Sequence, residues 1–187
     1  MGLRDGAGSA ILETMCDNLA TQPTFEAAVA ETLEAAIRVV GAHRGNIQLP
    51  EGDRLLIAEN RGFTKPFLDT FREVCTADGS ACGRSFRQRQ PVVIPDVTED
   101  MEYVPFRDAA AGAGYRGVVT APLIATSGHL MGFVSTHFAH AHAPSAVELQ
   151  RLNSICSIAG NHLQLLLGAD TLAVKASRMQ ATVYKSA

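Results

Sequence analysis

With 187 residues, 47% of them hydrophobic, the chain is long enough to bury the core of one globular domain and to carry a short extra segment. Its net charge of −3 leaves no basic surplus, so we do not expect nucleic acid as a partner. No apolar run approaches about 18 residues, and the first residues lack the apolar core of a secretion signal, so we expect no membrane partner either.

The four cysteines show no C-x-x-C spacing, and two of them fall in predicted helices; they are Cys16, Cys75, Cys82 and Cys156. We interpret them as reduced thiols, not as a disulfide framework or a zinc site. The expected location is therefore the cytoplasm.

The first third of the chain predicts two helices and a pair of strands. Ser9 can cap a helix over residues 9–20, and Thr24 can cap a second helix whose apolar residues recur at helical spacing. Short strands over residues 46–49 and 55–59 then flank a turn rich in Pro, Gly and Asp. Strands this close in sequence are expected to pair.

The middle of the chain alternates short helices with one strand. Residues 64–74 fit a short helix, and Ser80 can cap the next one. Residues 92–94 form a strand, and a loop leads to Pro105, a natural first-turn residue for a further helix.

A hairpin follows, with apolar runs over residues 118–124 and 130–138 that are rich in Val, Ile, Phe and Thr. Neither run alternates cleanly with polar residues, which indicates burial on both faces and a place at the centre of the sheet. Pro122 cannot donate a ladder hydrogen bond and should lie near a strand end or a bulge. Small residues leave room for a helix or a ligand against the sheet: Gly117, Ala121, Gly132 and Ser135.

The last long element is a helix that begins at a capping box formed by Ser145 and Glu148 and runs to about Gly168. Residues 169–187 have weaker periodicity and fit either a further helix that leans on a partner or a frayed tail. The order of elements predicts an α+β fold, with a mostly antiparallel sheet and helices on its faces.

Six stretches carry a family signature by their order and separation: GNIQL (45–49), RGF (61–63), GSACGR (79–84), VIPDV (93–97), TAPL (120–123) and GFVSTHF (132–138). Together they resemble a GAF domain, most closely the GAF modules of bacterial sensor histidine kinases and related signalling proteins. The resemblance implies a central antiparallel sheet of about five or six strands. Terminal helices would lie on one face, and short helices and loops would roof a pocket on the other.

The resemblance also sets the domain limits. It implies a GAF domain over residues 1–168, with its core at about 24–167 and an N-terminal helix at 9–20. Residues 169–187 would form a C-terminal tail or helical extension.

Known ligands of the family include cyclic nucleotides, bilins and haem. Bilin-binding members carry a Cys followed by His, which this sequence lacks. Members that bind cyclic nucleotides in phosphodiesterases carry an Asn-Lys-…-Phe-Asp-Glu signature, and nothing similar occurs here. We therefore expect neither ligand and no cofactor.

Cys82 suggests an enzymatic alternative, because GAF-fold free methionine-(R)-sulfoxide reductases have a Cys-Gly at what resembles this position. A thiol near a helix N-terminus can have a lowered pKa. Those enzymes need further cysteines in the next long loop, and residues 98–114 contain none. One cysteine cannot supply both attack and resolution, so the reductase remains the runner-up.

Three histidines close in sequence, His137, His140 and His142, raise the question of a metal site. His137 and His140 would lie on opposite faces if the strand continued, and no carboxylate or cysteine is adjacent. We expect no metal site.

The residues on the elements that roof the family's pocket are aromatic with a few polar groups, which suits a small-molecule site. The candidate ligand-binding residues are Phe67, Phe71, Ser80, Cys82, Phe86, Asp96, Tyr103, Phe106, Arg107, Tyr115 and Thr120. A basic turn at Arg84, Arg87 and Arg89 is either a solvated face or a positive rim for an anionic ligand.

The terminal helices carry an apolar stripe that approaches heptad spacing, which predicts a homodimer. The candidate interface residues are Leu12, Leu19, Leu152, Ile155, Ala159, His162 and Leu166. We expect a non-catalytic sensory or regulatory GAF domain that binds an unknown small molecule and acts on a signalling partner protein. The alternatives are the reductase and a purely structural dimerisation module whose pocket is filled by side chains.

Overall fold

The computed structural model describes residues 3–75, 77–168 and 170–186. Its helices and strands, in chain order, are α1 (Leu3–Ala20), α2 (Phe25–Val40), β1 (Arg44–Glu51), β2 (Arg54–Arg61), α3 (Lys65–Thr70), β3 (Glu73–Cys75), α4 (Ala81–Gln88), β4 (Val92–Ile94), the 3-10 helix η1 (Met101–Phe106), α5 (Arg107–Ala113), β5 (Gly117–Ile124), β6 (Leu130–Phe138), α6 (Ala146–Leu167) and α7 (Leu172–Ser186).

Within these residues, six strands form one antiparallel sheet in the order β3-β2-β1-β6-β5-β4. The predicted hairpin, β5 and β6, is confirmed in the interior of the sheet. The register shifts between Leu123 and Ile124, beside Pro122, as expected for a residue that cannot donate to the ladder. The α+β fold class is confirmed.

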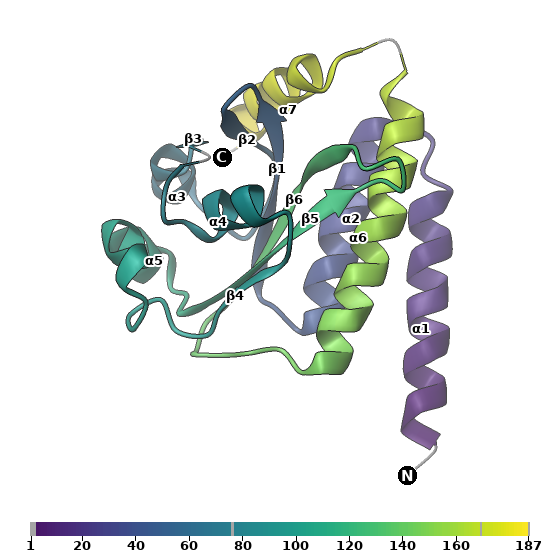
Figure 1. The fold of residues 1–187 in the computed structure, drawn as a ribbon, viewed down its shortest axis with the longest axis horizontal. Coiled ribbons are helices and arrows are strands. Elements are labelled where there is room, and N and C mark those ends of the chain that lie inside the picture. The colour runs from purple at the N-terminus through teal and green to yellow at the C-terminus, as the bar shows by residue number, and fades with distance from the viewer. Residues whose placement is uncertain (1–2, 76, 169, 187) are drawn as a thin grey trace.

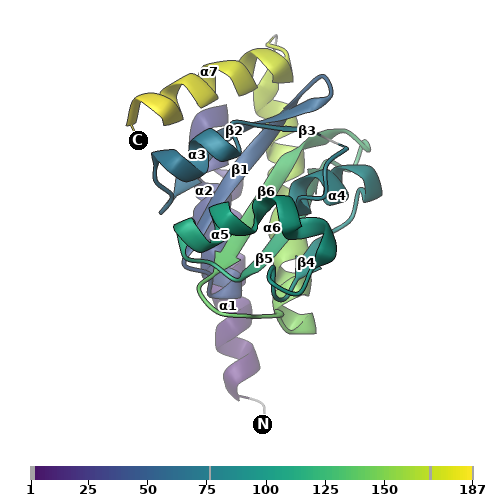
Figure 2. The same ribbon diagram turned by 90° about the vertical axis from the view of Figure 1, so that its left-hand side faces the viewer.

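The sheet separates two layers of helices (Figure 1). The long helices α1, α2 and α6 lie on one face, and the short helices α3, α4 and α5 lie on the other, as the turned view also shows (Figure 2). Side chains alternate along each strand, so Ile47 and Leu49 of β1 join the core under the long helices, whereas Leu55 and Ile57 of β2 join the core under the short ones.

Local signals in the sequence explain where the long helices begin and end. The Thr24 side chain accepts a hydrogen bond from the Ala27 backbone N–H at 3.2 Å, and Gly41 closes α2 at a φ of 65°. The predicted capping box of Ser145 and Glu148 is present at the start of α6.

Helix α6 approaches the β5–β6 hairpin so closely that only glycine fits at the contact. A Cβ on Gly160 would lie 2.6 Å from the backbone carbon of Ile124. The hairpin turn is also fixed to this helix, because Asn161 Oδ1 accepts hydrogen bonds from the Thr126 backbone N–H at 2.8 Å and from its hydroxyl at 3.0 Å. On the other side of the turn, Arg89 after α4 donates to the Gly128 carbonyl oxygen at 2.6 Å.

Three elements differ from the prediction. Residues 101–106, expected in a loop that leads to Pro105, form the 3-10 helix η1, and α5 begins only at Arg107. Helix α1 begins at Leu3, earlier than residue 9. The helix expected over 64–74 ends at Thr70, and residues Glu73–Cys75 form strand β3 instead. The pairing of β3 with β2 is supported by an ion pair between Arg54 and Glu73 at 2.9 Å, which helix periodicity does not reveal.

Residues 172–186, for which the sequence left two readings open, form helix α7, which folds back across the end of the β1–β2 hairpin (Figure 2). Lys175 pairs with Glu26 of α2 at 2.8 Å. Near the other end of the helix, Gln180 donates to the Arg72 carbonyl oxygen and the Tyr184 hydroxyl donates to that of Leu68. Helix α7 therefore contacts both helical layers. None of the described helices is both long and apolar enough to cross a membrane.

Candidate functional site

The floor of the candidate site comes from the two middle strands. Asn46 and Gln48 on β1, and Ser135 and His137 on β6, face away from the long helices. Each of the four is at most 4% exposed. Asn46 and Ser135 are direct partners in the β1–β6 register. These four polar side chains, with Thr120 of β5 beside Ser135, therefore form a polar patch on this sheet face.

The roof comes from α3, α4 and η1. Helix α3 supplies Phe67, Phe71 follows directly after that helix, and η1 supplies Tyr103. Helix α4 begins where the Ser80 hydroxyl accepts a hydrogen bond from the Gly83 backbone N–H at 3.1 Å. This cap turns the first residues of α4 toward the sheet, and Cys82 is buried there.

Between floor and roof lies a small enclosed cavity. The volume open to the centre of a water molecule is about 10 Å³, which is close to the space that one water needs. The residues that line it are Asn46, Gln48, Phe67, Phe71, Ser80, Ala81, Cys82, Tyr103, Val118, Ser135 and His137.

Three polar atoms of the cavity lining have no hydrogen-bond partner among the described residues. They are Oδ1 of Asn46, Oε1 of Gln48 and Nδ1 of His137. A buried polar group without a partner costs about 1–3 kcal/mol, and native proteins leave few of them. The three side chains are thus ready to bind a polar group that enters the cavity.

The Cys82 thiol, another polar group of the lining, has hydrogen-bond partners within the protein. The Cys82 thiol lies 3.2 Å from the Ser135 hydroxyl and 3.8 Å from that of Thr120, and the two hydroxyls are 2.8 Å apart. Burial raises the pKa of the Cys82 thiol to about 11, which outweighs the hydrogen bonds that favour the thiolate. The lowered pKa considered from the position near a helix N-terminus is therefore not found.

The remaining polar groups are also neutral at physiological pH. Burial, with a smaller contribution from Arg44, lowers the pKa of His137 to about 3, so its imidazole is uncharged. The Tyr103 and Tyr115 hydroxyls lie 2.9 Å apart, and burial raises the pKa of both. Aromatic rings surround the imidazole, with centroid distances of 4.6 Å to Tyr115 and 4.8 Å to Phe63.

The sequence matches the family profile of the GAF domain over residues 22–164, which is more than half of the chain. The chain belongs to the GAF family. No curated protein sequence matches it.

Solved structures of low sequence identity share the GAF fold. A domain attributed to a two-component sensor histidine kinase of Sinorhizobium meliloti has 18% identity and a TM-score of 0.63, over 79% of this chain and 95% of that one. The GAF domain of an Acinetobacter phosphoenolpyruvate-protein phosphotransferase has 10% identity and a TM-score of 0.69, over 85% and 94%. The free methionine-R-sulfoxide reductase of Neisseria meningitidis, solved with its substrate, has 16% identity and a TM-score of 0.72, over 90% and 95%.

Within this GAF domain, five of the predicted pocket residues line the cavity: Phe67, Phe71, Ser80, Cys82 and Tyr103. Two more contact the lining without forming part of it. Thr120 hydrogen-bonds with Cys82 and Ser135, and Tyr115 hydrogen-bonds with Tyr103.

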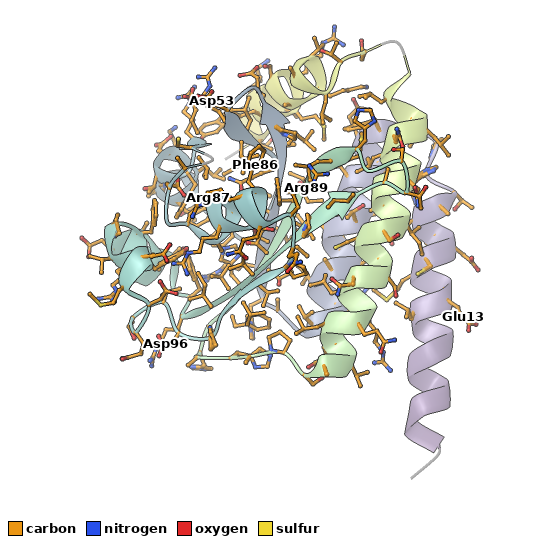
Figure 3. The ribbon with its side chains drawn as sticks, viewed as in Figure 1. Glu13, Asp53, Phe86, Arg87, Arg89 and Asp96 are labelled. Carbon is orange, nitrogen blue, oxygen red and sulfur yellow. The ribbon has the colours of Figure 1, made fainter. Side chains whose placement is uncertain are left out.

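The other four predicted pocket residues do not line the cavity. Asp96 pairs with Arg116 at the surface and lies at the lower edge of the molecule (Figure 3). Arg107 is occupied by the Val97 and Asp100 carbonyl oxygens, both at 3.0 Å. The remaining two, Phe86 and Phe106, are partly buried against Phe133 and Phe71, respectively. These four residues therefore lie outside the cavity lining, and a role for them in ligand binding stays a prediction.

The sequence reasoning missed Asn46, Gln48, Ser135 and His137. The available signal was the spacing N-x-Q in one predicted strand and S-x-H in another, since residues two apart lie on the same face of a strand.

The basic turn on α4 forms structural contacts and does not line the cavity. Figure 3 labels Arg87 and Arg89 beside this helix. Arg84 donates to both carboxylate oxygens of Asp100, at 2.8 and 2.5 Å. Arg87 donates to the Asp78 carbonyl oxygen at 2.7 Å. Neither arginine forms a positive rim for a ligand in the cavity.

Four of the proposed dimer residues are buried inside the protomer, with at most 1% exposure: Leu19, Leu152, Ile155 and Ala159. They pack in the core beneath the long helices and offer no area to a partner, which corrects their assignment. Leu12 and Leu166 are partly buried against the same core, and the His162 ring donates to the Gln22 carbonyl oxygen at 2.8 Å.

The three histidines that are close in sequence lie in different environments. His137 is buried and His140 is exposed. His142 stacks near Phe138, with ring centroids 4.3 Å apart. In residues 3–75, 77–168 and 170–186, no three His, Cys, Asp or Glu side chains meet in an arrangement that could hold a metal ion.

Proposed function

We propose that this GAF domain is a non-catalytic sensory module that binds a small molecule in the polar cavity and passes its occupancy to a signalling partner. The observation that carries the proposal is the set of three unpartnered polar atoms on residues that line one small cavity, Asn46, Gln48 and His137. Each of them gains a hydrogen bond when a polar ligand enters, whereas the empty state leaves all three without one. The domain is proposed to act in the cytoplasm, where its free thiols fit a reducing environment.

The ligand is proposed to select an open form of the domain. The space of about 10 Å³ suffices for a water molecule, so a larger ligand needs the roof to move outward. Helix α3 has only six residues, and Phe67 in it and Phe71 just after it contribute their side chains to that roof. A ligand that binds the open form better than the closed one shifts the population toward it.

The reductase is the second candidate, because one structural neighbour with a TM-score of 0.72 is a free methionine-R-sulfoxide reductase. Two observations argue against it. Cys82 is the one cysteine among the described residues that line the cavity, and its pKa of about 11 keeps the thiol protonated at neutral pH. Sulfoxide reduction needs a thiolate to attack and a second thiol to resolve.

The third candidate is a structural dimerisation module, which is favoured by the small size of the cavity. We propose a homodimer in either case, formed through the outward faces of the terminal helices. Leu165 on α6 is 80% exposed, and a partner helix that covered it would remove this apolar area from water. Light scattering should give a dimer mass for the wild type and a lower mass for Leu165→Asp, with Leu165→Met as the matched control. A monomer at high micromolar concentration contradicts the dimer.

Native mass spectrometry of freshly purified protein tests the sensory function. We expect a retained small molecule, or, for protein purified without one, a thermal shift with at least one compound of a metabolite panel. If no bound mass is detected and no compound gives a shift, the sensory cavity is contradicted and the structural module is favoured.

A further inference from the structure

We infer that the ligand of this cavity is an uncharged, planar heterocycle that donates N–H hydrogen bonds to the Asn46 and Gln48 side chains. The inference rests on the proposed function, since it names the class of molecule that the same cavity takes. It is carried by three features of the cavity: the charge of the lining, the kind of unpartnered atom on the floor, and the shape of the roof.

The lining carries no charge. None of the described residues that line the cavity is Asp, Glu, Lys or Arg. Arg84 of α4 is held by Asp100 and by Glu102 at 3.3 Å. Arg44 of β1, whose charge acts on His137, is not part of the lining and donates to the Ala113 carbonyl oxygen. A phosphate or carboxylate in the cavity would lack a cation, and an ammonium group would lack a carboxylate. Burial of an unpaired charge is far more costly than burial of a neutral polar group.

The floor calls for hydrogen-bond donors. The unpartnered atoms of Asn46 and Gln48 are carbonyl oxygens, which only accept. The two residues lie two apart on β1, so their backbones are separated by about 7 Å along one face. A ligand that satisfies both must present two donors along one edge. Neutral His137, on the adjoining strand, can accept or donate at Nδ1 according to its tautomer.

The roof calls for a flat ring. It is made of Phe67, Phe71 and Tyr103, whose rings suit offset or edge-to-face contacts with another aromatic system. A flat molecule also requires the smallest outward movement of α3. Neutral nucleobases and their relatives combine planarity, no charge and several N–H donors, and their phosphorylated forms do not fit the uncharged lining.

The experiment compares matched probes by isothermal titration and thermal shift. Uracil is tested against uracil-6-carboxylate, which keeps the ring and both N–H donors and adds a negative charge, and against 1,3-dimethyluracil, which keeps the ring but lacks both N–H donors; adenine is tested as a second free base. We expect a free base to bind, the carboxylate to bind at least about tenfold more weakly than uracil, and dimethyluracil to give no shift. Equal or stronger binding of the carboxylate or of dimethyluracil overturns the inference.

Variants on the floor give a second, independent readout. Gln48→Met and Asn46→Leu nearly keep the side-chain volume and remove an unpartnered amide oxygen. Each should raise the Tm of the free protein by about 2–4 °C and weaken binding of the base by about fivefold to tenfold. Gln150→Met, the same change on the exposed face of α6, should alter neither. Unchanged base affinity in both floor variants overturns the inference.

The outcomes separate this inference from the proposed function. If the bases give no shift but native mass spectrometry detects another retained molecule, the ligand class is wrong and the sensory function stands. If no compound is retained and none gives a shift, the ligand class and the sensory function are both overturned. The unpartnered atoms of the floor would then be satisfied by water alone.

Discussion

The Tyr184 hydroxyl, near the end of α7, donates a hydrogen bond to the carbonyl oxygen of Leu68 on α3. The Tyr184 ring also lies beneath two cations, with its centroid 4.8 Å from the Arg72 guanidinium and 5.4 Å from the Lys65 ammonium. Helix α3 therefore faces the cavity with Phe67 and faces α7 with its backbone and Lys65, and Arg72 adds a second cation just after the helix. The C-terminal helix holds the outer side of the roof.

Tyr184→Phe should loosen this roof. The ring and its cation contacts stay, while one hydrogen bond, worth about 1 kcal/mol, is lost. We expect faster hydrogen exchange in residues 65–72 and a Tm lower by about 2–4 °C. Ser154→Ala, which removes an exposed hydroxyl from α6, is the matched control. Unchanged exchange in residues 65–72 contradicts a holding role for α7.

Asp100→Asn should lower stability in a pH-dependent way. Arg84 holds the pKa of Asp100 below its ordinary value, so the ionised carboxylate stabilises the folded state. That contribution is complete above an unfolded pKa near about 4 and is lost as the pH falls through the folded value. Urea unfolding should show the variant less stable by about 1–2 kcal/mol at pH 7. The gap should narrow below about pH 4. A constant gap from pH 7 to pH 3 contradicts this assignment.

Two glycine substitutions should change the free energy of unfolding in opposite directions. A Cβ on Gly160 meets Ile124 backbone atoms at 2.6 and 2.8 Å, so Gly160→Ala must push α6 from the hairpin and should cost about 2 kcal/mol or more. A Cβ on Gly112 in α5 meets nothing within 4 Å. Gly112→Ala should therefore add about 0.5–1 kcal/mol through helix propensity. Chemical denaturation of the two variants beside the wild type measures both effects.

Cys82 should be an inert thiol. Its burial and its raised pKa of about 11 predict no reaction with a thiol reagent in the native state, whereas Cys75 is exposed and should react at once. For the same reason we expect no thioredoxin-coupled NADPH consumption with free methionine-(R)-sulfoxide. Turnover that disappears in Cys82→Ser or in Cys75→Ser would make this protein an enzyme.

The sequence predicted the sheet, the long helices and the hairpin well because these elements carry strong local signals. The Ser145 cap and the apolar run over residues 118–124 are examples. Strand β3 was missed, since its three residues gain their conformation from pairing with β2 and not from their own propensity.

The site was predicted in part. The roof residues Phe67 and Cys82 were predicted from the family resemblance, whereas the polar residues of the floor were not predicted. Asn46 and His137 become neighbours through the β1–β6 pairing, which links residues far apart in the sequence. The apolar stripe of α6 was assigned to a partner because a helix looks the same whether its own sheet or another subunit covers that side. Ile155 shows that the sheet does.

The turn between β5 and β6 has a mechanical consequence. Asn161 of α6 accepts hydrogen bonds from Thr126 in this turn, and Arg89 at the end of α4 donates one to Gly128. A tilt of α4 over the cavity therefore pulls on the same few residues that hold α6, around the rim of the sheet and not through its interior. Since the Gly160 contact leaves no side chain that could absorb such a motion, the turn would couple a movement of α4 to α6.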